Sequence, residues 1–169
     1  MGNVIGNEKL HKLIELHKLI EEAIQLELNV AEIYLSFHHR FPEDAGFWWK
    51  LVIEEKNHAA LLKSGEQNFL DAGMFPPELV STSLGTLINV NNELKGILDQ
   101  EGGENPSSRA EAFNLAIRLE ESAGEVHFQH AMQQAENPSD AIKLFQSLNE
   151  SDKNHADRMR NYMQINGIG

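Results

Sequence analysis

The chain has 169 residues, a formal net charge of −12 and no cysteine. The length suits one domain over residues 1–169, and the acidity disfavours nucleic acid and anionic membranes as partners. Without cysteine, the strong metal ligands that the chain offers are histidine and carboxylate side chains. No apolar run approaches the ~20 residues of a membrane span, and residues 1–6 show no signal-peptide pattern. We therefore expect a cytoplasmic protein.

The first half of the chain predicts two long helices. All five prolines lie between stretches of apolar periodicity, and because proline is excluded from helix interiors they separate the predicted helices. We expect a first helix over residues 8–40, capped by Asn7, and a second over 44–72, ended by Gly73 in the left-handed conformation. The connection between them is short, so the pair should form an antiparallel hairpin over 8–72.

A long crossover, residues 73–107, follows this hairpin. Its first part contains two adjacent prolines and is predicted to be extended. Ser83 can then cap a shorter helix over 84–100, which ends before a pair of glycines. A connection of this length separates the predicted fold from a bundle whose loops are all short.

Two further helices predict a second hairpin over residues 108–165. Ser107 or Ser108 can cap a helix that runs to about residue 135, and a last helix follows Pro138. No segment alternates with a period of two, so we expect no sheet. The predicted fold is all-α: a four-helix bundle of two antiparallel hairpins joined by a long crossover that contains a short helix.

The two predicted hairpins resemble each other in sequence. The tetrapeptide Lys-Asn-His-Ala occurs at residues 56–59 and again at 153–156, and the sequence at 23–27 resembles that at 116–120. The two matches occur in the same order and at nearly the same spacing, which a chance match of four residues would not explain. The two hairpins therefore look like copies of one unit.

Each predicted bundle helix carries a carboxylate on its apolar face, and two of them add a histidine three residues later. These six residues are Glu27, Glu55, His58, Glu120, Asp152 and His155. At about 1.5 Å of rise per residue, those of the first hairpin lie ~20–24 Å from its turn, and those of the second lie at a similar level. Folding the hairpins together should bring four carboxylates and two imidazoles into one layer of the core.

Such a layer needs positive charge, because ionised carboxylates in an apolar medium are costly and repel one another. Lysine and arginine are missing from the apolar faces, so a pair of divalent or trivalent cations is the natural counter-charge. Oxygen-rich ligands with one imidazole per metal suit iron or manganese, and zinc or cobalt can also occupy such a site. The alternative is that each Glu-x-x-His is a solvated pair and each carboxylate a boundary residue reaching for solvent.

These motifs resemble those of the di-iron carboxylate proteins of the ferritin-like superfamily, most closely rubrerythrin. The resemblance covers roughly residues 8–72 and 107–165. It implies that Glu27 and Glu120 are terminal ligands, and that each histidine binds one metal. It further implies that the acids of the two Glu-x-x-His-type motifs, Glu55 and Asp152, bridge two iron ions. The family's usual chemistry is reduction of peroxide by a di-ferrous centre, or oxidation of Fe²⁺.

The chain departs from the rubrerythrin pattern at three points. Asp152 replaces the usual glutamate and is one methylene shorter. Ala123 stands where rubrerythrin has a further carboxylate, which is linked to movement of the metal during the redox cycle. The four-cysteine electron-transfer domain of rubrerythrin has no counterpart, since the chain has no cysteine. A reductase of this kind would need a separate electron donor.

Several residues around the six predicted ligands have expected roles. Tyr34 and His127 occupy equivalent positions in the two halves and can hydrogen-bond metal ligands from facing helices, or can be core residues with satisfied polar tips. Trp48 should lie in the core. Trp49 is then available for a contact in a homodimer, unless the crossover covers it.

Three functions follow from this prediction. The first is a di-metal oxidoreductase, with iron before manganese or zinc, that acts on peroxide, dioxygen or Fe²⁺ as a rubrerythrin-like peroxide reductase or a ferroxidase. The second is a non-catalytic iron-binding or carrier protein. The third is a di-iron hydroxylase with an organic substrate.

Overall fold

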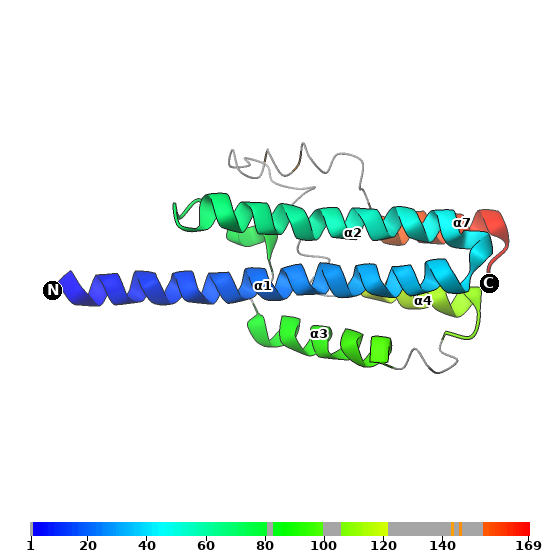
Figure 1. The fold of residues 1–169 in the computed structure, drawn as a ribbon, viewed down its shortest axis with the longest axis horizontal. Coiled ribbons are helices and arrows are strands. Elements are labelled where there is room, and N and C mark those ends of the chain that lie inside the picture. The colour runs from blue at the N-terminus through cyan, green and yellow to red at the C-terminus, as the bar shows by residue number, and fades with distance from the viewer. Residues whose placement is uncertain (1, 81–82, 100–105, 122–142, 144–145, 147–153) are drawn as a thin grey trace.

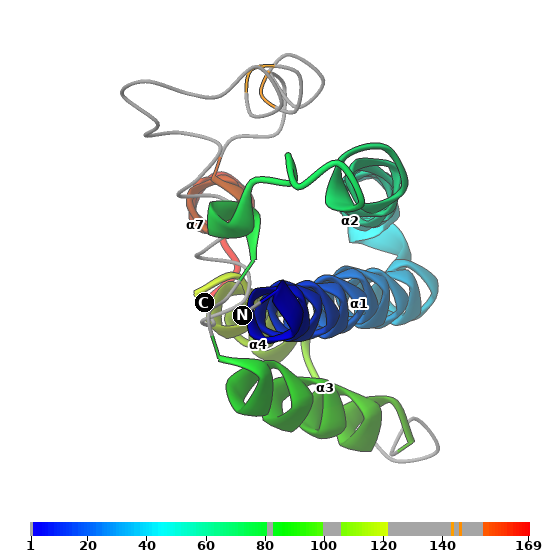
Figure 2. The same cartoon turned by 90° about the vertical axis from the view of Figure 1, so that its left-hand side faces the viewer.

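The computed structural model describes residues 2–80, 83–99, 106–121, 143, 146 and 154–169. Within these residues every regular element is helical and none is a β-strand, which confirms the predicted all-α class. Four helices run side by side, and they are α1 (Gly2–Arg40), α2 (Ala45–Gly65), α4 (Arg109–Glu120) and α7 (His155–Asn166) (Figure 1). The end-on view places a further helix, α3 (Leu84–Asp99), outside this group and against α1 (Figure 2).

The first hairpin forms as its prolines predict. Proline 42 opens a single 3₁₀ turn, Pro42–Asp44, and α2 starts directly after it, antiparallel to α1 (Figure 1). Aromatic side chains fill the space between the helices: the ring of Trp48 lies 5.0 Å from that of Phe37 and 5.7 Å from that of Tyr34, centroid to centroid. All three residues are buried, so Trp48 is a core residue as expected.

Helix α1 begins earlier than the sequence predicts. It starts at Gly2, so Asn7 lies inside the helix and is not its cap. Once the packed part of a helix exists, each further residue adds a hydrogen bond at little entropic cost, and no proline interrupts this stretch. The N-terminal end of α1 extends past the end of α2 (Figure 1), and Leu10 and Ile14 are accordingly exposed.

Helix α2 continues through a π-helical turn, Glu66–Leu70, and ends where glycine was expected to end it. Gly73 has φ +67°, the left-handed region that glycine adopts without strain. The backbone N–H of Gly73 donates to the carbonyl of Leu70 at 2.9 Å, and that of Met74 donates to Phe69 at 2.8 Å. These two bonds are a Schellman motif, which satisfies the last carbonyls of the helix.

Helix α3 lies on α1 through a buried polar contact. The hydroxyl of Ser83 accepts from the backbone N–H of Thr86 at 3.2 Å, so Ser83 caps α3 as predicted. Farther along α3, Asn91 accepts a hydrogen bond from Asn29 at 2.9 Å and donates to the backbone carbonyl of Glu22. These bonds fix how the crossover helix sits on the first hairpin.

The helices of the second hairpin are shorter than the sequence predicts. Ser108 caps α4 by accepting from the backbone N–H of Glu111 at 3.2 Å, but α4 ends at Glu120 rather than near residue 135. Helix α7 begins at His155, so an unbroken helix from 139 to 165 was wrong. The remaining parts of the predicted hairpin, including residues 122–142, lie outside the described residues.

A buried ion pair ties the two hairpins together at one end. Asp44, which is 1% exposed, accepts two hydrogen bonds of 2.7 Å from the guanidinium of Arg109 and one of 3.1 Å from the hydroxyl of Tyr162. Asp44 precedes α2, Arg109 begins α4 and Tyr162 belongs to α7. The turn of the first hairpin is thereby fixed to both described helices of the second. Among the described helices, none is both long enough and apolar enough to cross a membrane.

Candidate metal centre

The first half of the site lies between α1 and α2. Glu55 and His58 are three residues apart on one face of α2, and Glu27 faces them from α1; each is at most 2% exposed. The Nδ1 atom of His58 lies 3.1 Å from Glu55 Oε2 and 3.3 Å from Glu27 Oε2. Two carboxylates therefore converge on one imidazole nitrogen, away from solvent.

The second half repeats this arrangement with residues of the second hairpin. His155 Nδ1 lies 2.7 Å from Glu55 Oε1 and 3.3 Å from both oxygens of Glu120, the last residue of α4. Glu55 thus presents one oxygen to each histidine. The two imidazole rings are nearly parallel, with an angle of 10° and centroids 5.6 Å apart. The site has an approximate internal symmetry, which agrees with the sequence repeat.

His155 reaches the site from a helix start. Asn154 adopts the left-handed conformation, φ 51°, which asparagine tolerates better than most residues. Its side chain accepts from the backbone N–H of Asp157 at 3.2 Å and so caps α7. His155 is therefore the first residue of α7, and the expectation that it shares one continuous helix with Asp152 was wrong. Asp152 itself lies outside the described residues.

Five of the six predicted ligands come together in the structure, and these are Glu27, Glu55, His58, Glu120 and His155. Tyr34 also contacts the site: its hydroxyl donates to Glu120 Oε1 at 2.5 Å, the kind of bond to a ligand on a facing helix that was expected of it. His127, its counterpart in the other half, lies outside the described residues.

One acidic residue at the site was not predicted. Glu54 is 4% exposed, and its Oε2 lies 3.2 Å from His155 Nε2 and 2.7 Å from a guanidinium nitrogen of Arg158. The sequence places Glu54 beside the apolar face of α2, and its repeat counterpart is Ser151, so neither signal marked it. The useful signal was the spacing of His155 and Arg158, which puts an imidazole and a cation on one face of α7.

Protons neutralise the carboxylates when no cation does. Burial raises the pKa of Glu27 to about 8, and the neighbouring His58 offsets this only in part. Burial opposes charge on His58 and His155, yet the carboxylates beside them dominate: the pKa of His58 rises to about 10 and that of His155 rises well above its usual value. Burial also works against ionisation of Glu55, but the two histidines lower its pKa.

The pKa of Glu54 is also lowered, by an arginine as well as by a histidine. Burial would raise it, but hydrogen bonds and charges from His155 and Arg158 outweigh that effect and lower the pKa to about 2. Glu54 is therefore ionised at neutral pH with two cationic partners. It holds the Nε2 side of His155, which leaves Nδ1 directed at Glu55 and Glu120.

The donor set fits metal ions. Two groups of three ligand atoms, Glu27–Glu55–His58 and Glu55–Glu120–His155, each lie within 4.8 Å of one another, and the groups share Glu55. Glu55 Oε1 is buried and makes no hydrogen bond of normal geometry within the described structure, although His155 Nδ1 is only 2.7 Å away. Without a metal, a proton on the imidazole serves this contact; once His155 loses that proton, its Nδ1 and Glu55 Oε1 can both donate to one cation. Oxygen and imidazole donors without sulfur suit iron, manganese or zinc.

Comparison of the chain with protein-family models, with curated proteins and with solved structures finds no match.

Proposed function

We propose that this chain is a di-metal carboxylate protein that binds iron in preference to manganese or zinc. The observation that carries the proposal is the position of Glu55, whose two oxygens face the Nδ1 atoms of two different histidines at 3.1 and 2.7 Å. A carboxylate placed in this way can bridge two cations. Glu27 and His58 would complete one metal position, and Glu120 and His155 the other.

Charge supports a pair of ions. With both imidazoles neutral, Glu27, Glu55 and Glu120 carry three negative charges in a buried layer, close to the four positive charges of two divalent ions. A fourth carboxylate would complete the balance, and we propose Asp152 for it. Metal binding would displace the protons that the histidines and Glu27 otherwise hold.

We also propose that the helices have the ferritin-like arrangement. Four described helices run alongside one another with α3 outside them, and the metal ligands come from all four (Figure 2). The ligands lie in one layer, as expected of two hairpins that are copies of one unit.

The reaction we propose is reduction of peroxide or dioxygen, or oxidation of Fe²⁺ as the substrate. A bound iron pair would supply the redox equivalents. The chain's own residues exclude water, since all five proposed ligands are at most 2% exposed. Tyr34 donates a hydrogen bond to one oxygen of Glu120, and the carboxylate of Glu54 lies 3.2 Å from His155 Nε2. Such a closed site favours a small oxidant over the organic substrate of a hydroxylase, and a reductase would take electrons from a separate donor.

Homodimer formation through Trp49 stays a prediction. Trp49 is 48% exposed, which leaves its ring available for such a contact.

A non-catalytic iron-binding protein is the second candidate function. The carrier function is favoured by the acid–base pairs of the site, because the same side chains can satisfy one another without metal. A protein that loads and releases iron needs this kind of metal-free state.

Metal analysis and two activity assays separate the candidates. The protein, purified without added metal, is analysed for metal identity, loaded with Fe²⁺ under anaerobic conditions and then assayed for peroxide consumption and aerobic Fe²⁺ oxidation. We expect the iron-loaded protein to turn over peroxide, Fe²⁺ or both. The rate should be about tenfold or more lower in His58→Ala. The control Glu32→Ala, an exposed acid on α1, should behave as wild type. Metal binding without turnover would support the carrier, and no metal binding would contradict both.

A further inference from the structure

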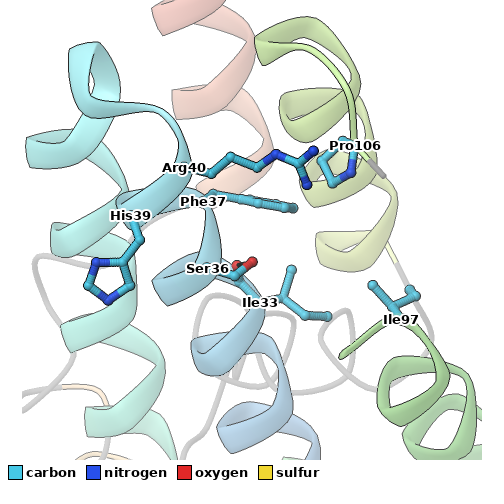
Figure 3. A pocket seen from close by; sticks show the side chains of 7 residues that line it. All are labelled: Ile33, Ser36, Phe37, His39, Arg40, Ile97 and Pro106. Carbon is cyan, nitrogen blue, oxygen red and sulfur yellow. Dashed lines mark hydrogen bonds between the residues drawn. The ribbon is translucent and has the colours of Figure 1, made fainter. Parts of the chain in front are cut away.

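A cavity of about 320 Å³ lies away from the metal centre, where the last turns of α1 meet the end of α3 and the start of α4. Four apolar residues form its walls: Ile33 and Phe37 of α1, Ile97 of α3 and Pro106 (Figure 3). Ser36 and Arg40 contribute polar groups from the same side of α1. A cavity of this size, mostly apolar with a few polar groups, has the composition of a small-molecule site.

Arg40 supplies a positive charge at this cavity. Figure 3 shows its guanidinium extending from α1 toward Pro106. Of the arginines, Arg109, Arg158 and Arg160 form ion pairs, whereas Arg40 and Arg118 form none within the part of the chain that the structure describes. Arg40 thus places a cation beside an apolar cavity.

The acidic residues near Arg40 are engaged elsewhere. Asp44 and Glu43 both face Arg109, at 2.7 and 3.9 Å. Glu111 accepts hydrogen bonds from the backbone and hydroxyl of Ser107 at 2.7 and 2.9 Å. The carboxylate of Glu111 still interacts electrostatically with Arg40, but among the described residues no acid forms an ion pair with it. An anionic ligand can therefore pair with this guanidinium, and in a chain of net charge −12 this local cation is what such a ligand requires.

We propose that this cavity binds a medium-chain aliphatic carboxylate of about eight carbons. The carboxylate would pair with the planar guanidinium of Arg40, which matches it with two parallel hydrogen bonds. The alkyl chain would lie against Phe37, Ile33 and Ile97. The volume admits such a chain but not a long one, because it lies at the lower end of the range for ligand cavities. This site is separate from the proposed metal centre and does not depend on it.

Octanoate and the uncharged octan-1-ol are the probes that test this proposal, titrated into the full chain and followed by NMR. We expect octanoate to bind with a Kd of roughly 0.1–1 mM. Affinity should rise roughly two- to fourfold per methylene from butyrate to octanoate. Arg40→Gln should weaken octanoate about tenfold and leave octanol unchanged. Arg118→Gln, the same change at an arginine that does not line the cavity, should leave both unchanged.

A second variant fills the cavity without touching the charge. Ile97→Trp, at a partly buried wall position, should abolish binding of both probes while the helical circular dichroism stays that of wild type. Three results would overturn the proposal: octanoate binding that Arg40→Gln does not weaken, equal loss in Arg118→Gln, or affinity that does not depend on chain length. Unaltered binding in folded Ile97→Trp would show that the ligand sits elsewhere and would overturn it too.

Discussion

Glu54 contacts a proposed metal ligand, His155, without being one of the proposed ligands itself. Its carboxylate contacts the Nε2 atom of His155, while Glu55, one residue later, contacts the Nδ1 atom of the same ring. Consecutive residues on α2 thus hold both edges of one imidazole. Partners of this kind fix the orientation of a metal-binding histidine and so tune the affinity of the site.

We expect Glu54→Ala to weaken mainly the metal position at His155. Removing the carboxylate frees Nε2 and lets the ring turn, whereas the position at His58 keeps both of its carboxylates. Loss of such an outer partner typically lowers metal affinity 10–100-fold. Metal content after dialysis against a weak chelator should fall from two ions toward one. Complete loss of both ions would mean that Glu54 is itself a ligand of both positions.

Tyr34→Phe tests the bond to Glu120. The variant removes a donor 2.5 Å from a buried carboxylate oxygen and leaves the ring in place against Trp48. We expect it to lower the free energy of unfolding of the metal-free protein by ~1–3 kcal/mol, as measured by urea denaturation. Phe37→Tyr makes the opposite change on the same helix by adding a hydroxyl, and its free energy of unfolding is compared with that of Tyr34→Phe. Unchanged stability of Tyr34→Phe would show that the hydroxyl contributes nothing to holding Glu120.

Two side chains at the start of α4 contribute separately to the stability of the fold. The hydroxyl of Ser108 caps the helix, and Arg109 pairs with the buried Asp44. We expect Ser108→Ala to cost ~1 kcal/mol of stability. Arg109→Ala should cost more, because it leaves a buried carboxylate without its two strongest bonds. Thermal unfolding of both variants shows which one loses more stability. A larger loss of stability in Ser108→Ala than in Arg109→Ala would contradict the role given to the ion pair.

Helix boundaries divide into those that the sequence predicts and those that it does not. Gly73, Ser83 and Ser108 act where they were expected, because each supplies a local group that a helix end requires. The start of α7 was missed because apolar periodicity continues through Asn154, and a single left-handed residue leaves that pattern unchanged. The π-helical turn at Glu66–Leu70 likewise has no signature in periodicity.

The sequence predicts those residues of the candidate site that interrupt the apolar face of a helix. Glu27, Glu55 and Glu120 interrupt apolar stripes. The repeat pairs Glu27 with Glu120, and His58 follows Glu55 by three residues, so local spacing identifies them. The contact of Glu54 with His155 and Arg158 joins residues about a hundred positions apart. Only the packing of α2 against α7 creates that contact, and no pattern within either helix contains it.

For the whole molecule, the pKa shifts predict how stability depends on pH without metal. In the folded state Glu27 and His58 hold protons up to about pH 8 and 10, whereas the unfolded chain releases them near 4.5 and 6.5. Such groups stabilise the fold below the unfolded pKa, and their contribution is lost as pH rises through the folded pKa. As the pH rises from 5 to 10, the free energy of unfolding of the metal-free protein should therefore fall. Glu54 acts in the opposite sense, with its contribution lost as pH falls from 4.5 to 2.

Urea denaturation of the chelated protein at pH 5.5, 7 and 8.5 measures this dependence. Glu27→Gln, which has no proton to lose, should show a smaller decline between pH 5.5 and 8.5 than wild type. The difference between the two proteins isolates Glu27 from the general repulsion of a chain with net charge −12. Equal declines would show that Glu27 is ionised in the metal-free site.

The most direct test counts metal ions per chain after identical anaerobic reconstitution with Fe²⁺ and removal of excess metal. In the proposed centre Glu55 would serve both ions, because it faces both histidines, whereas His58 would serve one. We predict two ions per chain in wild type, fewer than one in Glu55→Ala and about one in His58→Ala, with Glu32→Ala equal to wild type. Two ions retained in Glu55→Ala, or none bound by the wild-type protein, would contradict a two-metal centre organised around Glu55.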